Sequence, residues 1–79
     1  MNNYIATFYS QYGALSLRKE LLSREIAAEL ISVPRQLSTS CGVCVTFKHD
    51  DWDCAKGAED LEGVYLVIDD GRYEELLSC

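Results

Sequence analysis

Four runs of β-branched and aromatic residues divide this chain, and segments with helical spacing lie between them. Residues 4–9, 27–33, 42–47 and 63–68 have the composition of strands, and the last run is apolar enough for a central place in a sheet. Residues 11–24 carry apolar side chains at intervals of three and four, which predicts a helix. These periods restrict the chain to a mixed helix and sheet architecture.

A second, weaker helix is predicted after the third strand. Asp50 is suited to cap it, and Trp52, Ala55 and Ala58 give it a thin apolar stripe. The order of elements is then β-α-β-β-α-β. This order predicts an α+β fold, a ferredoxin-like sandwich with a four-stranded antiparallel sheet and two helices on one face.

The length of 79 residues predicts a single domain (1–79) with a modest core. The predicted elements place that core at about residues 3–69. Asp70 and Gly71 form a predicted turn, and residues 70–79 are expected to be a C-terminal tail or a short helix.

Charge is unevenly distributed along the chain, whose net charge is −6. After His49 there are ten acidic residues, and only Lys56 and Arg72 oppose them. Nucleic-acid binding needs clustered basic residues, so we expect no nucleic-acid partner. The acidic half is either a solvated face or a contact for a basic protein.

The apolar runs are all much shorter than the ~20 residues of a membrane span, so we expect no membrane partner. Residues 1–8 lack the basic and apolar regions of a signal peptide. We therefore expect a cytoplasmic protein whose four cysteines are reduced.

Two of the cysteines form a C-x-x-C motif, Cys41 to Cys44. If the third strand runs through both residues, their side chains point to opposite faces and their Cα atoms are about 10 Å apart. A disulfide needs a Cα separation below about 7 Å, so Cys41 would have to lie in the loop and curl back. Strand alternation thus disfavours a redox pair but leaves Cys44 as a possible resolving thiol.

The remaining cysteines and the histidine give no metal signature. Cys54, Cys79 and His49 are irregularly spaced, whereas structural zinc sites use paired knuckles. We expect no metal and no cofactor. Cys54 is predicted to pack inside the second helix, and Cys79 is a second possible resolving thiol.

Cys41 is the strongest candidate for chemistry, because it lies at a predicted loop-to-strand junction. Gly42 removes a side chain next to it and permits close approach by a partner. Ser38, Thr39 and Ser40 bring hydroxyl and N–H groups near the sulfur, and Arg35 is placed to favour a thiolate.

The segment Pro34-Arg35-Gln36-Leu37-Ser38-Thr39-Ser40-Cys41-Gly42, preceded by a strand and a helix, resembles the hallmark of the small selenium/sulfur (Se/S) carrier-like family. That hallmark is Pro-Arg-(Glu/Gln)-Leu-Ser-x-Ser-Cys-Gly, and the resemblance covers roughly residues 3–69. Cys44 is not part of it, and the glycine expected to close the first helix is replaced near Glu25.

The resemblance implies a carrier protein rather than an enzyme. Cys41 would hold a persulfide or selenosulfide, supported by Arg35, Ser38, Ser40 and Gly42. Its partners would be a desulfurase-like sulfur or selenium donor and an acceptor enzyme. The sequence leaves two other functions open: a regulatory module that binds a ligand or partner through residues 34–42, and a thiol redox protein that uses Cys41 with Cys44 or Cys79. The oligomeric state is also left open.

Overall fold

A computed structural model describes residues 1–37, 41–69 and 71–78. In chain order the elements are β1 (Asn2–Phe8), α1 (Gln11–Ser23), β2 (Ala28–Ser32), β3 (Val43–His49), the 3₁₀ turn η1 (Asp53–Ala55), β4 (Leu61–Asp69) and β5 (Arg72–Ser78). The chain is therefore an α+β protein, as predicted.

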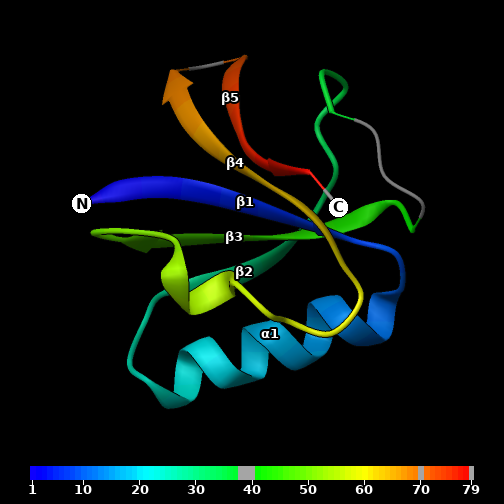
Figure 1. The fold of residues 1–79 in the computed structure, drawn as a ribbon, viewed down its shortest axis with the longest axis vertical. Coiled ribbons are helices and arrows are strands. Elements are labelled where there is room, and N and C mark those ends of the chain that lie inside the picture. The colour runs from blue at the N-terminus through cyan, green and yellow to red at the C-terminus, as the bar shows by residue number, and fades with distance from the viewer. Residues whose placement is uncertain (38–40, 70, 79) are drawn as a thin grey trace.

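The strands form one five-stranded sheet in the order β2-β3-β1-β4-β5, and every neighbouring pair is antiparallel. β3 lies between β1 and β2, which α1 connects, so the β-α-β unit is split by an inserted strand. Figure 1 shows α1 along one side of the sheet, with the β2–β3 connection and the β4–β5 hairpin on the other side.

The predicted second helix is wrong, because the chain forms only the short turn η1 there. The carboxylate of Asp51, rather than Asp50, accepts a hydrogen bond from the backbone N–H of Asp53. Lys56 is already extended, and Gly57 adopts a φ of 78°, which ends any helix. The thin apolar stripe is too small to keep three turns packed on the sheet.

The prediction of a C-terminal tail or short helix is also wrong, since residues 72–78 form the fifth strand. Gly71 has a φ of 84° in the turn that reverses the chain. β5 then pairs with β4 along its length, and its Leu76 and Leu77 pack against the core. The sheet therefore has one strand more and one helix fewer than predicted.

The core lies between α1 and the sheet. Its largest side chains with almost no exposed surface include Phe8 of β1, Leu21 of α1, and Val45 and Phe47 of β3. Ser10 caps α1, because its hydroxyl accepts a hydrogen bond from the N–H of Gly13.

The C-terminal end of α1 closes without glycine. The N–H of Glu25 donates to the carbonyl of Leu22, and the N–H of Ile26 donates to that of Leu21, which is a Schellman motif. Glu25 takes the left-handed conformation, with a φ of 63°. A non-glycine residue therefore occupies the position where the sequence lacks the expected glycine.

In the described part of the chain, the one helix that forms is too short and too polar to cross a membrane.

Candidate functional site

The β2–β3 connection contains the segment singled out in the sequence. It begins with a hydrogen-bonded turn in which the N–H of Leu37 donates to the carbonyl of Pro34 over 3.0 Å. The two ends of the connection are joined by a hydrogen bond, in which the N–H of Val33 donates to the carbonyl of Gly42 over 3.3 Å. This bond continues the pairing of β2 with β3 by one residue on each strand. Ser38, Thr39 and Ser40 lie outside the described residues.

Cys41 lies just before β3, which begins at Val43. Its half-buried thiol donates a hydrogen bond to the carbonyl of Val43 over 3.3 Å. Gly42 has a φ of 78°, and a Cβ placed there would meet no atom within 4 Å. Space is therefore open on the Cβ side of Gly42, the residue after Cys41, and the backbone conformation favours glycine.

The assumption that strand alternation runs through Cys41 is wrong. The left-handed Gly42 turns the backbone immediately after this residue, so the extended geometry starts one step later. The separation of about 10 Å expected for two residues of one strand therefore does not apply to Cys41 and Cys44.

Cys44 differs from Cys41 in its environment, since it lies inside β3 and is fully buried. It pairs with Thr7 of β1 and Ile31 of β2. Burial raises the pKa of the Cys44 thiol to about 11, and the nearby Cys41 adds to this shift. At neutral pH the Cys44 sulfur is therefore held as a neutral thiol.

This contrast predicts selective alkylation of the native protein. At neutral pH iodoacetamide should modify Cys41 and leave Cys44 unreacted, because Cys44 is both buried and protonated. Since the folded-state pKa of Cys44 is raised from 9.0 to about 11, its ionisation in the unfolded chain should destabilise the fold as pH rises through that window. Peptide mapping after alkylation at several pH values measures the labelling of each cysteine. Rapid labelling of Cys44 in the native protein at pH 7 would contradict the predicted selectivity.

The predicted supporting groups are placed only in part. Arg35 is exposed in the turn after β2, and within the described residues it makes no hydrogen bond or ion pair with Cys41. Ser38 and Ser40 fall in the segment that is not described. Their roles near the sulfur therefore stay predictions.

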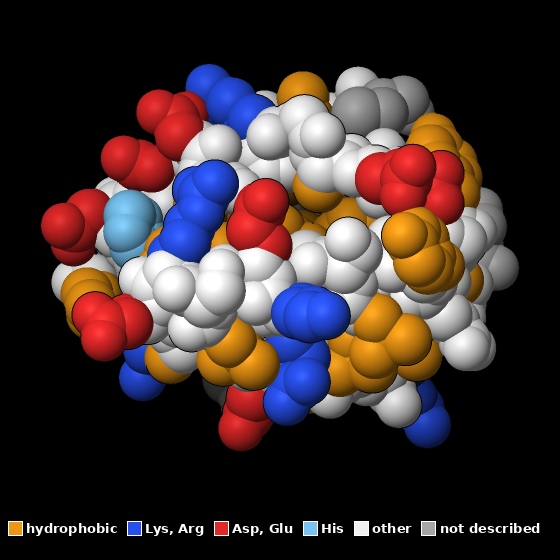
Figure 2. All heavy atoms as spheres, turned by 90° about the horizontal axis from the view of Figure 1, so that it is seen from below, with side chains coloured by type: hydrophobic (Ala, Val, Ile, Leu, Met, Phe, Trp, Pro, Cys, Tyr) orange, Lys and Arg blue, Asp and Glu red, His pale blue; other side chains and the backbone are white. Residues whose placement is uncertain are grey.

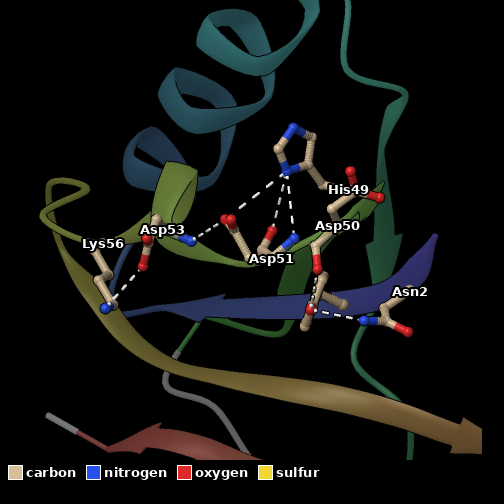
Figure 3. A network of polar contacts seen from close by, with 7 residues as sticks. Asn2, His49, Asp50, Asp51, Asp53 and Lys56 are labelled. Carbon is tan, nitrogen blue, oxygen red and sulfur yellow. Dashed lines mark hydrogen bonds and ion pairs between the residues drawn. The ribbon is translucent and has the colours of Figure 1, made fainter.

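Cys54 and His49, the other described candidates, lie away from this loop. Cys54 is in the turn η1 rather than in a helix, and the pKa of its half-buried thiol is raised mainly by burial. Figure 3 shows His49 beside Asp51, and Lys56 paired with Asp53 at 2.8 Å; these contacts brace the turn after β3. Cys79 lies outside the described residues.

Metal ligands were not expected, and the described residues contain no group of three or more histidine, cysteine or acidic side chains that could hold an ion.

A shallow groove of about 460 Å³ lies next to the β2–β3 connection, which contains Cys41 and is called the candidate loop from here on. It is formed by the turn after β2 and by the β4–β5 hairpin, and its lining residues are Gln36, Leu37, Tyr65, Ile68, Gly71, Arg72, Tyr73 and Glu75. Reasoning from the sequence missed it, because its lining residues Arg72, Tyr73 and Glu75 belong to β5, which was predicted as a tail or a short helix. The signal that could have revealed it is the alternation of Tyr73 with charged residues at the start of β5.

The fold and the loop define a small α+β domain with a half-buried cysteine next to a glycine in a strand connection. A family model described as "Putative Se/S carrier protein-like" matches residues 3–65, which include α1, β2, the β2–β3 connection, β3 and all of β1 except Asn2. The chain belongs to this family. No curated protein and no solved structure gives a significant match.

Proposed function

We propose that this protein carries sulfur or selenium on Cys41. The Cys41 thiolate attacks the outer sulfur of a persulfide on a donor enzyme, a new S–S bond forms, and the donor leaves as a thiolate. Cys41 then holds a persulfide, or a selenosulfide if the transferred atom is selenium. An acceptor takes the outer atom by the same displacement, which regenerates the thiol.

The observation that carries this proposal is the contrast between Cys41 and Cys44 within one motif. Cys41 is half-buried at a loop end and has open space beside Gly42, whereas Cys44 is fully buried. A carrier thiol must meet two different partners, so it needs access on a surface loop. The family match to residues 3–65, which include Cys41, supports the same role.

The chemistry of a carrier demands little from the rest of the site. The partners supply activation of the sulfur, and the carrier has to present one nucleophile and protect its load from water. The half-buried position of Cys41 suits this task. The protein is accordingly proposed as a carrier and not as an enzyme, with its donor and acceptor acting in the cytoplasm.

The proposal is tested by loading and discharge. The purified protein is incubated with a cysteine desulfurase and cysteine, and its intact mass is recorded. We expect a gain of one sulfur atom per chain, and we expect cyanide to remove that atom as thiocyanate. A protein that never gains sulfur, or that gains it in a form cyanide cannot remove, would not be a carrier.

A thiol redox protein that uses Cys41 with Cys44 is a second candidate. It is favoured because the Cys41 thiol contacts the Val43 carbonyl, which is bonded directly to the Cys44 nitrogen, and because Cys41 is near enough to contribute to the raised pKa of Cys44. Oxidation by diamide would then remove two hydrogen atoms, form a Cys41–Cys44 disulfide and reduce the diamide to its hydrazine.

The two candidates give different masses, since a carrier gains sulfur from the desulfurase and a redox pair loses hydrogen to diamide. A Cys44→Ala variant separates them further. It should retain sulfur loading but cannot form the disulfide. Loss of loading in that variant would mean that Cys41 alone is not sufficient to hold the sulfur.

A further inference from the structure

The five-stranded sheet ends in two edge strands, β2 and β5. An edge strand presents a row of backbone N–H and C=O groups that another strand can pair with. Native proteins block such edges with charge, proline or a covering element. The two edges of this sheet differ in how far they are blocked.

The negative charge of the β5 edge disfavours pairing with a second copy of this chain. Glu74 and Glu75 lie at its middle, and any antiparallel self-pairing centred there places a glutamate opposite a glutamate. Together the described residues of β4 and β5 carry four carboxylates against the one cation of Arg72. Repulsion therefore protects this edge.

The β2 strand contains no proline and no pair of adjacent like charges that would block its edge. Its sequence is Ala-Glu-Leu-Ile-Ser, and Leu30 at the centre is 38% exposed. In an antiparallel pairing centred on Leu30, Glu29 lies opposite Ile31 of the other copy and Ala28 lies opposite Ser32, so no two like charges are directly opposite each other. From residue 11 to 32, three cations balance three anions, which leaves this side of the molecule neutral.

Exposed leucines continue this edge onto α1. Leu15 and Leu22 are 51% and 45% exposed, and their spacing of seven residues puts them on one side of the helix. Leu22 reaches β2, because it lines a hollow of about 470 Å³ together with Ala27 and Ala28. Figure 2 shows hydrophobic side chains gathered along the lower border of the α1 side of the molecule, with basic side chains between them.

We propose that β2 is the interface of a symmetric dimer, in which β2 of one copy pairs antiparallel with β2 of the other about a two-fold axis through Leu30. The two sheets then join into one continuous sheet, and Leu22 and Leu30 of each copy are covered. Because the strands run in opposite directions, the two Cys41 loops lie at opposite ends of this junction. Each copy keeps its own thiol open to a partner.

Sedimentation velocity over a range of protein concentrations tests the dimer. We expect wild type to approach the mass of two 8.9 kDa chains as concentration rises. Because Leu30 faces itself across the axis, Leu30→Lys and Leu30→Glu should each be monomeric, and an equimolar mixture of the two should dimerise again. Ile68→Lys is the control, since Ile68 is 50% exposed on β4 and its substitution should leave the dimer intact.

A wild type that stays monomeric at every concentration would overturn the proposal, as would a dimer that persists in both Leu30 variants. Circular dichroism of each variant confirms that the fold is kept. Recovery of the dimer on mixing cannot arise from unfolded chains. The outcome is independent of sulfur loading, so the carrier function and the dimer succeed or fail separately.

Discussion

Replacing Phe47 with alanine is expected to lower the free energy of unfolding by about 3–5 kcal/mol. The Phe47 ring is 2% exposed in β3, stacks on Tyr4 with ring centroids 5.4 Å apart, and belongs to the cluster between the sheet and α1. Its removal leaves a cavity that the neighbouring strands can fill only in part. Since a small domain has a total stability of about 5–15 kcal/mol, this variant should be close to unfolding.

Urea unfolding followed by circular dichroism measures the effect. The matched control is Tyr12→Ala, because Tyr12 is an aromatic residue of α1 that is 66% exposed. Its replacement should change the free energy of unfolding by no more than about 0.5 kcal/mol. Equal losses in the two variants would mean that the cluster around Phe47 is not the core of the fold.

Local pattern was sufficient to predict most of this fold. The runs around β1, β2, β3 and β4 and the apolar spacing of α1 each coincide with an observed element. The helix could be predicted because α1 buries one face, so its apolar side chains repeat with the helical period. The strands could be predicted from their composition, since β1 is buried on both faces from Tyr4 to Phe8.

The segments that were predicted incorrectly depend on contacts far away in the chain. Residues 72–78 contain glutamates and leucines, which favour helices, yet they form β5 because the open edge of β4 offers a ladder of hydrogen bonds. Around Trp52 the pattern predicted a helix, but the extended Lys56 and Gly57 with its positive φ end it after a single turn.

The candidate site was predicted through its motif more than through its geometry. The sequence placed Cys41 at the end of the β2–β3 connection, and the structure has it there. Its relation to Cys44 was predicted from a regular strand, and this failed because the conformation of a glycine cannot be read from its neighbours. The groove beside the loop required knowledge of β5.

The second large effect is expected for Cys41→Ser, which should reduce sulfur loading by a desulfurase to background. Serine keeps the size of the side chain but cannot form a persulfide under these conditions. Cys44→Ala and Cys54→Ser should load as wild type does, because Cys44 is buried and Cys54 lies in the turn η1, away from the loop. Intact mass spectrometry of the four proteins measures this, and unchanged loading of Cys41→Ser would assign the sulfur elsewhere.

The most direct test of the central claim is the position of the transferred sulfur in the wild-type protein. After incubation with a desulfurase and cysteine, the protein is alkylated, digested and mapped by mass spectrometry. If Cys41 is the carrier thiol, the additional sulfur atom is found on Cys41 in its peptide, and cyanide removes that atom. If the sulfur is found on Cys44, Cys54 or Cys79, or on none of them, the proposed function is wrong.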